Sequence, residues 1–185
     1  MLQTVGVLLI LAALGCVGLI IFGLGDTAGT IPTEESELYA PRKEVVGPAD
    51  KTLYLTIPKL GLEDIKVYDS LSEEKLADST IHVPQTGFPW QPGANTYIAG
   101  HRLGFAGSDS FLVFLRLNEL ERGDEVTLKD STSREYIYRI TGAMEVTPED
   151  VEVMSPVAGK SIISLQTCTF PDFSNRLIVR GELAS

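Results

Sequence analysis

Cysteine and histidine are scarce in this chain, and clusters of basic residues are absent. Among 185 residues there are two cysteines and two histidines. The 15 Lys and Arg residues are outnumbered by 25 acidic residues and are not clustered along the sequence. Phosphate contacts need clustered Lys and Arg, so the net charge of −10 excludes a nucleic-acid partner. No internal repeat or low-complexity tract is present. The length suits one well-cored domain once the first quarter is set aside.

Charged residues are also missing from the run Val5–Leu24, which is about as long as a helix that crosses a bilayer. We expect residues 1–25 to form an N-terminal transmembrane anchor that contacts membrane lipid. A cleaved signal peptide fits less well, because no basic segment precedes the run. No Lys or Arg comes before Arg42, so charge does not set the orientation. Residues 26–50 are predicted to be a stalk and residues 51–185 a folded domain.

The domain has the pattern of a mainly β protein. Short segments rich in β-branched and aromatic residues alternate with turn-forming residues, which is typical of one barrel or sandwich. We predict an antiparallel β-barrel with a few short helices. The expected strands are Thr52–Gly61, Ile65–Asp69, Asn95–Gly100, Asp124–Asp130, Arg134–Val146, Lys160–Phe170 and Asn175–Leu183, and the expected helices are Ser72–Ser79, Phe111–Leu120 and Thr147–Met154.

Cys168 is the first candidate for chemistry. It ends the apolar strand segment SLQTC, and strand ends are where rigid scaffolds present catalytic groups. Cys16 lies within the apolar N-terminal run, so a disulfide between the two is implausible. A lone thiol in a chain that looks exported points to a free reactive group. The alternative is a small buried hydrophobic residue.

Few residues could activate this thiol. His101 follows the strand NTYIA through a glycine, whereas His82 lies in a segment with Pro and Gly that looks like a loop. Arg176 begins the last strand only eight residues after Cys168, so a hairpin would bring its guanidinium beside the thiol, where it could stabilise an oxyanion. Taken singly, each of these side chains could instead be structural.

Together these motifs resemble one family. The segments TYIAGHR, FLRLNELERGDEV, SLQTC and RLIVRG occur in the order and with the strand-end His, Cys and Arg that are found in sortases. The resemblance covers about Lys51 to Leu183 and implies an eight-stranded sortase-type β-barrel. The stretch before His101 is similar to the class D and class E branches.

The resemblance also implies an activity, with catalytic roles for His101, Cys168 and Arg176. Cys168 would cleave a sorting signal of the Leu-Pro-x-Thr-Gly or Leu-Ala-x-Thr-Gly type after Thr and form a thioester. Arg176 and the backbone amide after Thr167 or Thr169 would hold the oxyanion. His101 would protonate the leaving amine, and an amine of a cell-wall precursor or protein would resolve the thioester. The expected partners are exported proteins with this C-terminal signal, and the domain would lie outside the cytoplasm on a single-pass anchor.

Several further expectations accompany this reading. The substrate groove is predicted to include Thr167, Leu165, Ile98 and His82, and no cofactor or metal is expected. Two other functions stay open on sequence grounds. A membrane-anchored cysteine peptidase would use the same Cys and His with water as acceptor, and a non-enzymatic extracellular β-domain would leave Cys168 inert.

Overall fold

The computed structural model describes residues 45–184. Within these residues no helix is both long and apolar enough to cross a membrane. The predicted anchor at residues 1–25 and most of the predicted stalk lie outside the described residues, so both stay predictions. The compact unit that holds the described residues runs from 43 to 185.

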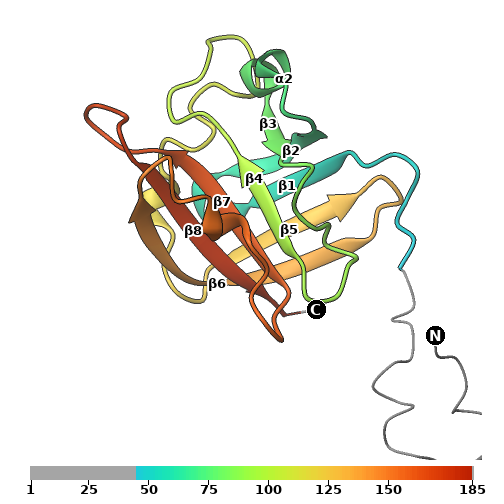
Figure 1. The fold of residues 1–185 in the computed structure, drawn as a ribbon. Coiled ribbons are helices and arrows are strands. Elements are labelled where there is room, and N and C mark those ends of the chain that lie inside the picture. Colours follow the sequence, from blue (N-terminus) through green and yellow to red (C-terminus); the bar gives the residue numbers. More distant parts are fainter. Residues whose placement is uncertain (1–44, 185) are drawn as a thin grey trace, which may run out of the picture. The chain divides into compact units, whose positions relative to one another are not determined.

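Eight strands close into a barrel in the order β1-β2-β3-β4-β7-β8-β6-β5 (Figure 1). Most neighbours are antiparallel, but β2 with β3 and β4 with β7 are parallel. One short α-helix and three 3-10 helices lie in the connections. The bounds are β1 Leu53–Ile57, η1 Pro58–Leu60, β2 Leu62–Asp69, α2 Glu73–Asp78, β3 Thr80–His82, β4 Asn95–Ala99, η2 Leu117–Glu119, β5 Glu125–Asp130, β6 Glu135–Val146, η3 Val151–Met154, β7 Ile162–Cys168 and β8 Arg176–Leu183.

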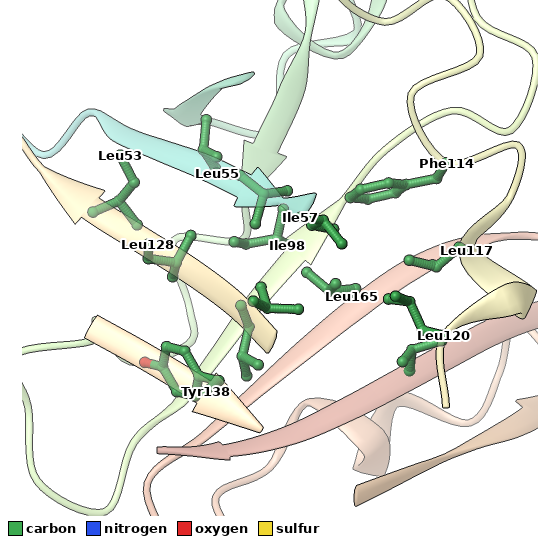
Figure 2. Packing of buried hydrophobic residues seen from close by; sticks show 14 of the residues in the cluster. Leu53, Leu55, Ile57, Ile98, Phe114, Leu117, Leu120, Leu128, Tyr138 and Leu165 are labelled. Carbon is green, nitrogen blue, oxygen red and sulfur yellow. The ribbon is translucent and has the colours of Figure 1, made fainter. Parts of the chain in front are cut away.

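The core fills the barrel interior, because alternate residues of each strand point inward. Figure 2 shows Leu55, Ile98 and Leu165 pointing toward one another from three strands that are far apart in sequence. Phe114, from the long β4–β5 connection, joins this cluster and is fully buried. The connection therefore closes one end of the barrel with side chains.

The predicted barrel is largely confirmed, but it is not wholly antiparallel as predicted, because β2 with β3 and β4 with β7 are parallel. Each of the seven predicted strands is present, and the eighth is β3, which has only three residues. The predicted helix Ser72–Ser79 is present as α2, while Thr147–Met154 contains only the short η3. The predicted helix Phe111–Leu120 is wrong: turns occupy most of it, and only Leu117–Glu119 is 3-10. Its buried apolar residues cover the barrel end: Val113, Phe114, Leu117 and Leu120.

Two adjacent pairings matter most for function. Strand β7 lies between β4, which runs parallel to it, and β8, which runs antiparallel. The ends of β4 and β7 and the start of β8 therefore meet at one edge of the barrel (Figure 1).

Replacing Leu165 with Ala should destabilise the barrel by about 2–5 kcal/mol, because the fully buried side chain would leave a cavity among Ile98 and its neighbours. Leu103→Ala is the matched control. Leu103 is 45% exposed, so its loss should change the free energy of unfolding by less than about 0.5 kcal/mol. Urea unfolding followed by fluorescence of the single tryptophan, the buried Trp90, measures both. Equal effects in the two variants would contradict the assigned core.

Candidate active site at the β4, β7 and β8 strand ends

Cys168 and Arg176 face each other across the β7–β8 hairpin. They are the last register pair of the two strands, and Cys168 is a free, half-buried cysteine. Leu165 and Leu177 belong to the core, so alternation places both Cys168 and Arg176 on the outer face. The predicted hairpin thus brings a guanidinium beside the candidate nucleophile.

His101 reaches the same edge from β4. Ala99 is in register with Gln166, and the Gly100 amide donates to the Gln166 carbonyl at 3.0 Å. His101 and Cys168 each lie two residues beyond that register pair along parallel strands. A side chain on Gly100 would clash with Phe114 at 2.6 Å in the interior, so glycine is needed here and His101 falls on the outer side.

Burial dominates the electrostatics of His101. It lowers the pKa of the imidazole below its ordinary value, because a partly desolvated ring disfavours the charged form. The ring packs edge-on against Phe105, with 5.5 Å between centroids. Neutral imidazole is therefore the favoured form near neutral pH, and it can accept a proton from a thiol.

Arg176 is anchored by the loop that joins β7 to β8. Its Nη1 donates to the carbonyls of Phe173 and Asn175, both at 3.1 Å. Within the described residues these bonds use Nη1 alone, which leaves Nη2 and Nε for a ligand. The amide of Thr169 already donates to the Asn175 carbonyl at 3.1 Å. The backbone amide that follows Thr167 is a candidate oxyanion donor.

A pocket of about 140 Å³ lies on the outer face, and Arg176 is the one of the three candidate catalytic residues that lines it. Tyr97, Gln166 and Arg176 line it on the barrel side, and residues of the β6–β7 loop form the opposite wall. Burial raises the pKa of Tyr97 to about 12, so its hydroxyl keeps its proton and donates to Gln166 Oε1 at 2.7 Å.

The β6–β7 loop is fixed to the barrel by two side chains. Arg180 Nη2 and Asn95 Nδ2 both donate to the carbonyl of Val153, at 2.8 and 3.0 Å. Asn95 also donates to the Ser155 carbonyl at 3.2 Å. These bonds hold η3, which contains Val151 and Val153, over β4, β7 and β8 as the wall of the pocket.

Three predicted groove residues are placed differently. Ile98 and Leu165 have no exposed surface and pack in the barrel core (Figure 2), and Thr167 is 1% exposed. All three are inward-facing members of the strands that carry the candidate catalytic groups. This inward orientation speaks against the predicted groove role, and alternation places the sequence neighbours Tyr97 and Gln166 on the outer face, where both line a pocket.

His82 is also corrected. It is fully buried; Nδ1 lies 2.9 Å from Asp69 Oδ1, and Nε2 lies 3.1 Å from the Gly87 carbonyl. Its ring packs on Phe88, with 4.3 Å between centroids. Both ring nitrogens have partners, so His82 links β3 to β2 and to the following loop, which speaks against its predicted place in the groove.

Sequence reasoning missed Tyr97, Gln166 and Arg102. Counting back two residues from Cys168 would have found Gln166, since residues i and i−2 share a face. Arg102 follows His101 directly but turns toward β7, where it bonds the Cys168 carbonyl at 3.2 Å. Among residues 45–184 no group of His, Cys, Asp and Glu could hold a metal ion.

A thiol, an imidazole and a guanidinium at three adjacent strand ends form a candidate cysteine-based site at the edge of a closed β-barrel. The family model of the sortase domain matches residues 55–184. The chain is 32% identical to sortase A of Bacillus anthracis over 143 residues. This alignment covers 77% of this chain and 61% of that protein. It is also 43% identical to sortase A of Streptococcus agalactiae serotype III (strain NEM316) over 93 residues, an alignment that covers 49% of this chain and 37% of that protein.

A solved structure agrees with these relatives. Group B Streptococcus Pilus Island 1 sortase C2 is similar with a TM-score of 0.66 and 26% identity, over 75% of this chain and 77% of that one. The chain belongs to the sortase family. It spans less than two thirds of the length of the two curated sortase A relatives. The relatives are named as sortase A and sortase C, so the resemblance to classes D and E stays a prediction.

The imidazole of His101 should titrate below about pH 6.5, the ordinary histidine value, because burial disfavours its cation. Unfolding would return the pKa of His101 to its ordinary value, so the unfolded chain binds this proton more tightly than the folded one. The free energy of unfolding should therefore increase as pH rises toward and through about 6.5. NMR titration of the ring C–H signals, assigned by the loss of one in His101→Ala, gives the midpoint. A midpoint above about 6.5 would mean that an anionic partner, not burial, controls the ring.

Proposed function

We propose that the chain is a sortase transpeptidase that uses Cys168 as nucleophile, His101 as acid and base, and Arg176 as oxyanion donor. The observation that carries the proposal is the register: Cys168 is paired with Arg176, while His101 is brought to the same edge by the parallel pairing of β4 and β7. Family membership supports the same chemistry for this constellation.

In the first step the Cys168 sulfur attacks the carbonyl carbon of the scissile peptide bond. The oxyanion accepts hydrogen bonds from Arg176 Nη2 and Nε and from the backbone amide after Thr167. The thiol proton passes to His101, which then donates it to the departing amine as the C–N bond breaks. The products are a thioester on Cys168 and a free amine fragment, and His101 is neutral again.

In the second step an acceptor amine attacks the thioester. His101 takes the proton that the amine loses, and the thiolate of Cys168 leaves and is reprotonated. The net result is a new amide bond between the exported protein and the acceptor. Water as acceptor would give the cysteine peptidase instead, so the competition between amine and water decides between these two outcomes.

The residues before the scissile bond are proposed to lie in the pocket between η3 and the outer face of β4 and β7. Gln166 shares its face with Cys168 two residues away, a spacing of about 7 Å along a strand. An extended peptide that runs from this pocket toward Cys168 would place its carbonyl at the thiol. Val151 and Val153 supply apolar surface there.

The remaining assignments follow the same proposal. The substrates are exported proteins with a C-terminal signal of the Leu-Pro-x-Thr-Gly or Leu-Ala-x-Thr-Gly type, and the acceptor is an amine of a cell-wall precursor or a protein. The apolar run Val5–Leu24 supports a single-pass membrane location with the domain outside the cytoplasm. The class D or E branch is kept as the proposed subgroup.

Mass spectrometry of the full chain in detergent, with a panel of such peptides and excess triglycine or diaminopimelate-type amine, tests the activity. A thioester adduct on Cys168 should form and convert to an amine-ligated peptide. Cys168→Ala should abolish the adduct, because no nucleophile remains. Arg176→Ala should lower its rate by about 100-fold or more, as for loss of an oxyanion donor.

The exposed Arg116, which pairs with Glu119, provides the charge-matched control. Arg116→Ala should react like the unmodified chain. Free acid as the only product would assign a peptidase, and the absence of an adduct with every peptide would favour the non-enzymatic β-domain.

Filling the pocket should weaken peptide binding without changing the thiol. Val151→Trp is expected to lower kcat/KM about tenfold, mainly by raising KM, because η3 carries Val151 at the pocket wall. The rate of Cys168 alkylation by iodoacetamide should stay unchanged. Val46→Trp, at a residue 87% exposed and outside the pocket, is the control. An unchanged KM in Val151→Trp would place the peptide elsewhere.

A further inference from the structure

The backbone ladder between β4 and β7 ends before it reaches the candidate catalytic pair. Its last described bond joins the Gly100 amide to the Gln166 carbonyl at 3.0 Å. His101 and Cys168 lie beyond this bond, each next to a loop. The β7–β8 pairing holds Cys168 on its other side, but the β4–β7 ladder does not connect it to His101, so their relative position depends on another contact.

Arg102 makes that connection. It is the residue after His101, and its Nη1 donates to the carbonyl of Cys168 at 3.2 Å. The guanidinium also lies over the ring of Phe170, 4.5 Å from its centroid. Both contacts tie the segment that carries His101 to the segment that carries Cys168.

A third contact fixes the guanidinium from the barrel end. Arg102 Nη2 donates to Asn118 Oδ1 at 2.8 Å, and Asn118 belongs to η2. The main chain on either side of Arg102 is held as well: the Phe114 amide donates to the His101 carbonyl at 3.2 Å, and the Leu112 amide donates to the Leu103 carbonyl at 2.8 Å. The arginine is thus built into a rigid frame.

We propose that Arg102 is a positioning residue that sets the distance and orientation of Cys168 relative to His101 by bonding the nucleophile's own carbonyl. The proposal rests on the proposed function of that pair. Arg102 contacts the backbone of Cys168, so it acts on the reaction through Cys168 and not on the substrate.

Lysine cannot replace this residue. The two acceptors, Cys168 O and Asn118 Oδ1, are met by two nitrogens of one planar guanidinium whose face covers Phe170. An ammonium group keeps the charge but is a compact donor without this fork. Comparing Arg102→Lys with Arg102→Gln therefore separates geometry from charge.

The test uses the full chain in detergent with Arg102→Lys, Arg102→Gln and the control Arg116→Gln. Arg116 is exposed, lies in the same β4–β5 connection and pairs with Glu119, so its variant removes an equal charge without touching Cys168. Both Arg102 variants should lower kcat by about 10- to 100-fold, the size expected for a misplaced reacting group, while KM changes less than about threefold. Arg116→Gln should keep the original values.

A second readout needs no peptide. The rate of Cys168 alkylation by iodoacetamide is measured against pH with and without His101→Ala, and the difference between the two profiles reports the coupling of thiol and imidazole. This difference should shrink at least about threefold in the Arg102→Gln background and persist in Arg116→Gln. If the unmodified chain ligates no peptide, the proposed function fails, while the alkylation profiles still decide the role of Arg102.

Two results would overturn the proposal: full activity and coupling in Arg102→Lys, which would assign the effect to charge, or Arg102→Gln behaving like Arg116→Gln. If neither Arg102 variant folds, Asn118→Ala decides. It removes only the outer anchor of the guanidinium and should lower kcat by about two- to fivefold at constant KM. Unchanged kcat in a folded Asn118→Ala would likewise count against positioning.

Discussion

The parallel pairing of β4 with β7 is the constraint on which the site depends. Because the two strands run in the same direction, both end at one edge of the barrel, and the register Ala99 with Gln166 fixes how far each extends. A slip of one residue would turn either His101 or Cys168 from the outer face to the core. Strand β8 is antiparallel and starts at this edge, so Arg176 needs only a short loop to arrive beside the thiol.

The inner face of β4 and β7 packs in the core, and their outer face lines the pocket. Ile98 and Leu165 fill the interior, while Tyr97 and Gln166, their neighbours in sequence, line the outer pocket. The pocket also needs its second wall, which Arg180 and Asn95 hold through the Val153 carbonyl. In the proposed function, a change of wall residues could therefore alter peptide preference without disturbing the core, since the wall residues of this loop lie outside the core cluster.

Much of the fold could be predicted because alternation and turn residues are local signals. Strand β3 was missed since three residues show no period, and the Phe111–Leu120 segment was misread because its apolar residues suit a helix as well as a barrel lid. The meeting of Cys168 and Arg176 followed from one short loop. The residues that line the groove could not be predicted in the same way. In β4 and β7 the sequence shows which residues alternate, but it does not show which of the two faces is the inner one.

The burial of His101 has opposite consequences for the two proton transfers that the proposed reaction requires. A lowered pKa makes the imidazole a weaker base toward the thiol of Cys168. The same shift makes the imidazolium a stronger acid toward the leaving amine. Breaking the C–N bond needs that acid, whereas accepting the thiol proton can be aided by bringing the two groups to a fixed short distance. A rigid frame around Cys168, to which Arg102 is proposed to contribute, would hold the thiol at this fixed distance and so offset the weaker basicity of the desolvated His101.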